Sequence, residues 1–196
     1  MKNLKQTFGS LYTVVLLGLS ACASVNPVGL AKLAAMDPLS ADPQQISVAA
    51  RLPESLRLRT GDLIMVVKTD GVTGPGAIDE TFYLAVADAA PGDAGLVIPE
   101  DGERLQTARV APGDIERLRA TQARARTLKA AGTAKGKGSL TVSARGGCKT
   151  GEFGDGRLVM NLYMQTETGG EWFPVVSALD LRRALDDEML DKIPAC

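Results

Sequence analysis

The chain has 196 residues, of which 22 are Lys or Arg, 23 are Asp or Glu and none is His, for a formal net charge of −1. This near-neutral balance excludes the strongly basic class of nucleic-acid-binding proteins, and the lack of histidine removes the commonest general base and metal ligand. The length fits one domain, or a domain with a tether, and is sufficient to bury a hydrophobic core.

The amino-terminal segment has the parts of a secretory signal. Lys2 and Lys5 give a positive start, and an uncharged, largely apolar run follows from Phe8 to Leu19. A helix that spans a bilayer needs about 20 apolar residues, so this run is too short to cross comfortably. It is typical of a cleaved signal peptide.

The run ends in Leu19-Ser20-Ala21-Cys22, which resembles the lipobox of bacterial lipoproteins, where signal peptidase II cuts before the cysteine. The resemblance implies that residues 1–21 are removed and that Cys22 becomes the first mature residue. Its sulfur would carry a diacylglycerol, and its amine usually carries a further acyl chain such as palmitate. Two or more acyl chains hold a protein firmly at a membrane. The alternative is an ordinary signal peptide cut near Ala21 or Ala23.

The residues after the cysteine favour one membrane over the other. In well-studied bacterial lipoproteins an Asp directly after the lipidated cysteine favours the inner membrane, whereas this chain has Ala23 and Ser24. We therefore expect an outer-membrane anchor with the body in the periplasm. Without Lys2 and Lys5 the mature chain has a net charge of −3, which argues further against nucleic acid as a partner.

Residues 22–45 are predicted to form the lipidated amino terminus and a tether, because Pro27, Pro38 and Pro43 interrupt any long element. Within this tether, residues 30–36 have the pattern of two helical turns that either dock on the domain or fray. Residues 46–196 are predicted to form a single β-rich periplasmic domain.

Alternating apolar residues and short β-branched runs predict mostly strands after residue 46. The strand segments are 46–52, 56–59, 63–67, 81–87, 96–98, 105–110, 140–144, 158–164 and 172–176. Most connections are too short for parallel crossovers. We therefore expect an α+β fold, with a mostly antiparallel sheet or sandwich-like domain of about seven strands.

Two helices complete the predicted domain. The first covers about 113–131, because Ile115, Leu118, Ala125 and Leu128 form a narrow apolar stripe. The second covers about 178–193, because the segment 177–180 has the pattern of a capping box and an apolar stripe follows it.

Two cysteines remain once Cys22 is set aside, and we expect Cys148 and Cys196 to form a disulfide. An oxidising compartment permits the bond, and an even number of thiols favours pairing. The alternative role for Cys148, a catalytic nucleophile, lacks a histidine to serve as its base.

Two segments are candidate binding surfaces. Residues 114–137 carry seven basic and two acidic residues, which predicts contacts with an anionic lipid surface. The candidate contacts are Arg117, Arg124, Lys129, Lys135 and Lys137. Trp172 and Phe173 form a candidate aromatic binding anchor.

These patterns contain no catalytic signature, metal-ligand spacing or cofactor motif, so we expect no catalytic residues, metal or cofactor. The body resembles uncharacterised envelope lipoproteins only loosely, and no activity follows from that likeness. The leading prediction is a non-catalytic, lipid-anchored binding or structural module that contacts the membrane and another envelope protein. The alternatives are an envelope hydrolase that uses carboxylates or a Ser–Lys pair, and a carrier of an apolar ligand.

Overall fold

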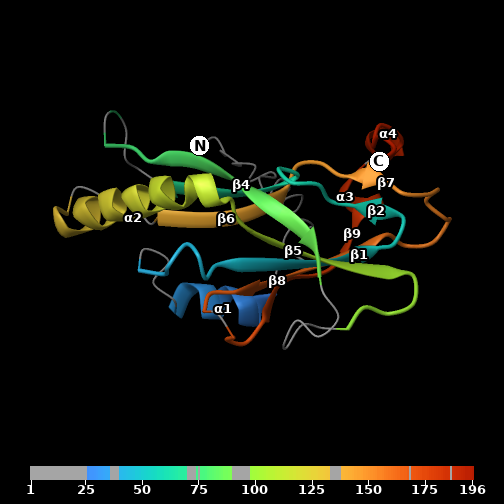
Figure 1. Ribbon diagram of the computed structural model, residues 1–196, viewed down its shortest axis with the longest axis horizontal. Helices are drawn as coiled ribbons and strands as arrows, with labels where there is room; N and C mark the ends of the chain where they lie inside the picture. Colours follow the sequence, from blue (N-terminus) through green and yellow to red (C-terminus); the bar gives the residue numbers. More distant parts are fainter. Residues whose placement is uncertain are drawn as a thin grey trace, which may run out of the picture.

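The fold is α+β, as predicted, and is built on one curled antiparallel sheet of seven strands (Figure 1). The computed structural model describes residues 26–35, 40–69, 74, 76–89, 98–132, 138–167, 169–185 and 187–196. The strand order across this sheet is β6-β3-β4-β5-β1-β8-β9, and β2 pairs with β7 in a separate two-stranded sheet. All of these strand pairs are antiparallel.

The strands are β1 (Ser47–Pro53), β2 (Leu56–Arg57), β3 (Leu63–Thr69), β4 (Asp79–Asp88), β5 (Glu103–Val110), β6 (Gly138–Ala144), β7 (Cys148–Lys149), β8 (Val159–Gln165) and β9 (Phe173–Asp180). The helices are α1 (Pro27–Ala35), the 3-10 turn η2 (Pro112–Asp114), α2 (Ile115–Ala130), α3 (Leu181–Ala184) and α4 (Asp187–Asp191). The strand expected at 96–98 falls almost wholly outside the described residues.

The core lies on one face of the sheet, where strand alternation places apolar side chains together. In β8, Met160, Leu162 and Met164 are 2–4% exposed. Their neighbours across the sheet include Val48 and Ala50 of the interior strand β1, which are 1–2% exposed. This period of two is the pattern that predicted the strands.

Helix α2 confirms the helix expected at about 113–131, preceded by η2. Its buried residues are Leu118, Thr121, Gln122 and Ala125, spaced so that they share one helical face. Figure 1 shows α2 lying along the half of the sheet that contains β4 and β6. Helix α2 also holds the segment before β1, because Gln122 donates to the Ala41 carbonyl at 2.8 Å.

The helix expected at about 178–193 is confirmed only in part, because two short helices stand where one continuous helix was expected. Strand β9 continues to Asp180, and only the short helices α3 and α4 follow it. Pairing with β8 extends through Val159 and Asp180, and Asn161 accepts a hydrogen bond from the Ala178 N–H at 2.8 Å. Ala178 has a φ of 53°, so the strand bends here instead of starting a helix. The cap residue is Asp180, which accepts from the Arg182 N–H at 3.2 Å.

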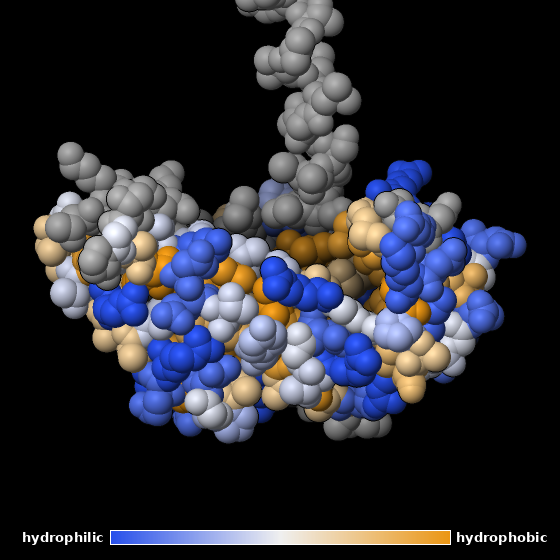
Figure 2. All heavy atoms as spheres, turned by 90° about the horizontal axis from the view of Figure 1, so that it is seen from above, coloured by the Kyte–Doolittle hydropathy of each residue, from blue (hydrophilic) through white to orange (hydrophobic). Residues whose placement is uncertain are grey.

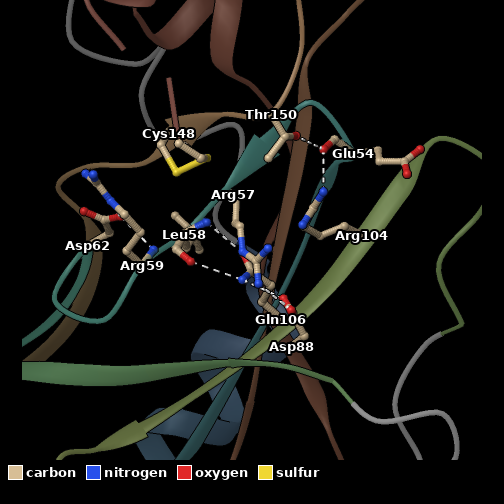
Figure 3. The surroundings of a disulfide bond; sticks show 11 residues. Glu54, Arg57, Leu58, Arg59, Asp62, Asp88, Arg104, Gln106, Cys148 and Thr150 are labelled. Atoms are coloured by element: carbon tan, nitrogen blue, oxygen red, sulfur yellow. Dashed lines mark hydrogen bonds and ion pairs between the residues drawn. A yellow bond between two sulfur atoms is a disulfide. The ribbon is translucent and has the colours of Figure 1, made fainter. Parts of the chain in front are cut away.

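One end of the molecule is closed by the predicted disulfide, since Cys148 is joined to Cys196 (Figure 3). The backbones beside it are also paired: the Lys149 N–H donates to the Pro194 carbonyl at 2.7 Å and the Cys196 N–H to the Lys149 carbonyl at 2.9 Å. The last residues of the chain are therefore fixed to β7.

Candidate functional site

Helix α1 is fixed to the edge strand β9, directly after the segment that would carry the lipid. Pro27 is the first helical residue, a position where proline is favoured because its missing N–H is not needed. Asn26 caps the helix, since its Oδ1 accepts from the N–H groups of Val28 at 3.0 Å and Gly29 at 3.2 Å.

The same asparagine ties the helix to the sheet. Its backbone N–H donates to the Val175 carbonyl at 3.2 Å, and its Nδ2 donates to the Ser177 Oγ at 3.0 Å. Asn26 therefore satisfies two helix amides and also fixes the start of α1 to β9.

Gly29 allows α1 to pack this closely. It is buried, and a Cβ at this position would lie 1.8 Å from the Pro174 carbonyl oxygen. At the next turn Lys32 forms an ion pair of 2.7 Å with Glu171, and its Nζ lies 5.6 Å from the centre of the Phe173 ring. The segment expected to be a tether thus packs against the domain over this stretch.

The outer face of α1, which we define as Pro27, Val28 and Ala31, points away from β9. All three residues are exposed, and Val28 retains 60% of its accessible surface. Lys32 is the charged residue of this helix, and its charge is paired with Glu171. The outer face is therefore uncharged and apolar.

Exposed large hydrophobic residues elsewhere in the described chain lie on separate elements. They are Tyr83 on β4, Ile98 before β5 and Met189 on α4. On the face seen in Figure 2, hydrophilic residues cover much of the surface, with hydrophobic residues showing between them and in a recess in the upper part of the view. Val28 differs from the other three because it follows Cys22, the cysteine of the predicted lipobox, closely in the sequence.

The basic residues of α2 are largely engaged within the domain. Arg117 lies 4.0 Å from the centre of the Phe82 ring, forms an ion pair of 3.0 Å with Glu80 and donates to the Thr81 carbonyl at 2.8 Å. Arg124 donates to the Ala77 carbonyl at 3.0 Å. These two predicted anionic-surface contacts therefore hold α2 on β4 and the loop before it.

Of the remaining residues of that predicted surface, the structure describes one. Lys129 is exposed near the end of α2, whereas Lys135 and Lys137 lie outside the described residues. The predicted lipidation site, Cys22, also lies outside them.

The predicted aromatic anchor is divided between the core and its boundary. Phe173 is 6% exposed and belongs to the hydrophobic core, so its ring is not presented to a partner. Trp172 is half-buried immediately before β9.

The disulfide end contains a polar cluster in which Gln106 of β5 is bonded to the segment after β2 (Figure 3). Gln106 is 2% exposed. Its Oε1 accepts from the Leu58 N–H at 2.7 Å, and its Nε2 donates to the Leu58 carbonyl at 3.1 Å. Nε2 also lies 3.1 Å from Asp88, which forms an ion pair with Arg57. Gln106 of β5 thus pairs with the backbone just after β2, as a neighbouring strand would, so its role is structural.

Asp180 is the described carboxylate with a perturbed pKa. It is 7% exposed, and this burial alone would raise the pKa of its carboxyl. Hydrogen bonds from Arg157 and the Arg182 N–H, with the positive charges of Arg157 and Arg183, outweigh burial and lower the pKa below its ordinary value. Among the described residues, no group of three or more His, Cys, Asp or Glu side chains is arranged to hold a metal ion.

Comparison with known proteins identifies no matching family model, curated protein or solved structure. Within the described ranges, no helix has the length and hydrophobicity needed to cross a membrane. Sequence reasoning missed the roles of Asn26 and Gly29. The Asn-Pro pair, a cap residue before a first-turn proline, was the available signal for the helix start.

Proposed function

We propose that this protein is a lipid-anchored, non-catalytic binding or structural module of the bacterial cell envelope. Cys22 would hold it at the outer membrane, with the domain in the periplasm. The observation that carries this proposal is the lipobox Leu19-Ser20-Ala21-Cys22 at the end of a signal-like segment, because only a thiol at this position accepts the diacylglycerol.

The Cys148–Cys196 disulfide supports a location outside the cytoplasm, because such bonds persist in oxidising compartments and are rare in reducing ones. Ala23 and Ser24 support the outer membrane, since neither is the Asp that favours retention in the inner membrane.

The uses of the buried polar side chains support a structural or binding role. Gln106 pairs with the backbone of Leu58, Asn161 with that of Ala178, and Asp180 caps α3. Each of these groups is occupied in holding the fold. A module of this kind acts through its surface, and we propose another envelope protein as its partner.

Replacement of the lipidated cysteine tests the anchor. Cys22→Ser should move the protein from the membrane fraction to the soluble periplasmic fraction, whereas the neighbouring Ser24→Ala should stay with the membrane. Equal membrane recovery of both variants would refute the anchor.

In-cell crosslinking followed by mass spectrometry tests the role of the module. The proposal predicts enrichment of a specific envelope protein with the wild type. Turnover of an envelope polymer by the purified domain, with no partner enriched, would instead support a hydrolase.

A further inference from the structure

We propose that α1 lies against the bilayer, with its outer face of Pro27, Val28 and Ala31 in contact with the lipid headgroups and the upper acyl chains. This inference rests on the proposed lipidation of Cys22. It goes beyond that proposal by giving the domain a defined orientation, with the β9 edge toward the membrane.

The distance from the lipid to the domain is short. Asn26 is bonded to Val175 and Ser177 of β9, and it follows Cys22 by four positions. Four residues span at most roughly 14 Å when fully extended. The headgroup region occupies about 5–8 Å on each side of the hydrocarbon core, so a lipidated Cys22 would bring the start of α1 to the membrane surface.

The start of α1 is suited to a partly dehydrated position. The amides of a helix amino terminus normally need water or a cap, and the Asn26 side chain already accepts from the N–H groups of Val28 and Gly29. Contact with lipid would therefore leave neither of these two amides without a partner.

The charge distribution favours the same orientation. Lys32 is paired with Glu171 at 2.7 Å, and the described residues of the outer face are Pro27, Val28 and Ala31. Burial of an unpaired charge would oppose membrane contact, but the outer face carries none. In contrast, Arg117 and Arg124 of α2 are engaged with Glu80 and backbone carbonyls, which makes α2 the weaker candidate for the membrane-facing surface.

The docking of α1 would transmit this orientation to the whole domain. Gly29 packs directly on the Pro174 carbonyl, so α1 and β9 present one surface. Figure 1 places α1 apart from β7 and the C-terminus. The disulfide end, with Cys196 and the exposed Glu152, would then lie away from the bilayer and be accessible to a periplasmic partner.

Tryptophan fluorescence in reconstituted vesicles tests the orientation. The chain has one tryptophan, so a Trp172→Phe background allows single reporters to be placed by Val28→Trp or Ala31→Trp on the outer face. Glu152→Trp, at an exposed position four residues after Cys148, is the matched control. The vesicles contain phosphatidylethanolamine and phosphatidylglycerol, part of it brominated at shallow positions of the acyl chains.

The test uses preparations whose intact mass shows the lipid. In these, the Val28→Trp and Ala31→Trp reporters should have blue-shifted emission, and the brominated acyl chains should quench most of their fluorescence. Glu152→Trp should show neither effect. Equal quenching at all three positions, or none at positions 28 and 31, would overturn the orientation while leaving the anchor intact. A protein without lipid would refute the proposed anchor, and the orientation with it.

Discussion

Gly29→Ala should release α1 from the sheet while leaving the rest of the domain folded. The added Cβ would lie 1.8 Å from the Pro174 carbonyl oxygen and 2.8 Å from its carbonyl carbon. Both are backbone atoms of β9 and cannot turn aside as a flexible side chain can. Helix α1 must therefore retreat from the strand.

The cost of that retreat follows from the contacts it breaks. Asn26 would lose its bonds to Val175 and Ser177, at about 1 kcal/mol each. Overpacking of a close contact costs about 1–3 kcal/mol, and the retreat of α1 from β9 relieves part of that cost. Alanine has a higher helix propensity than glycine, and this difference offsets about 1 kcal/mol of the cost. We expect docking to weaken by about 2 kcal/mol, which raises the undocked population about thirty-fold.

Trypsin cleavage after Lys32 and hydrogen exchange over residues 26–35 measure this opening. The rates of cleavage and of exchange should both rise about thirty-fold in Gly29→Ala, whereas exchange in β1 and β8 should stay unchanged. Gly113→Ala is the matched control, because a Cβ there meets no atom within 4 Å. If Gly29→Ala behaves like Gly113→Ala, the close packing of α1 on β9 is refuted.

Three further substitutions test the interior. Replacing both Cys148 and Cys196 by Ser should lower the free energy of unfolding in urea by roughly 4 kcal/mol, because the bond closes a loop with a sequence separation of 48; an unchanged midpoint would show that the bond does not restrain the chain. Gln106→Leu should cost about 2–4 kcal/mol, because it leaves the buried N–H and carbonyl of Leu58 unpaired, and a loss below that of a surface substitution would contradict this role. The folded-state pKa of Asp180 lies below its ordinary value of 3.8, so its ionised form stabilises the fold above that pH and this contribution disappears as the pH falls through the lowered pKa. The stability advantage of the wild type over Asp180→Asn should therefore be present at pH 6 and shrink in acid, and a difference independent of pH would exclude this linkage.

The fold class could be predicted from the sequence because the strands keep a regular alternation. Met160, Leu162 and Met164 all face the core, and Leu118 and Ala125 of α2 share the buried stripe expected of them. In both cases the apolar period is the physical cause of the structure.

The end of β9 could not be predicted, because pairing with the preceding strand β8 overrides the local capping pattern. The segment 177–180 is held as strand by β8, through the Val159–Asp180 pair and the Asn161 bond to Ala178. Asp180 does cap a helix, but that helix is only α3.

The candidate site was only partly predictable for a related reason. Cys22 stands in a local motif that a single sequence displays. The close approach of Gly29 to Pro174 and the pairing of Lys32 with Glu171 join residues that are far apart in the chain, and no local pattern marks them. The sequence therefore left open whether the segment after the lipobox docks or frays.

The most direct test of the account is the intact mass of the mature protein isolated from bacterial membranes. We expect a polypeptide that begins at Cys22 and carries the added mass of a diacylglycerol, with or without a further acyl chain. An unmodified amino terminus, or one that begins at any other residue, would contradict it.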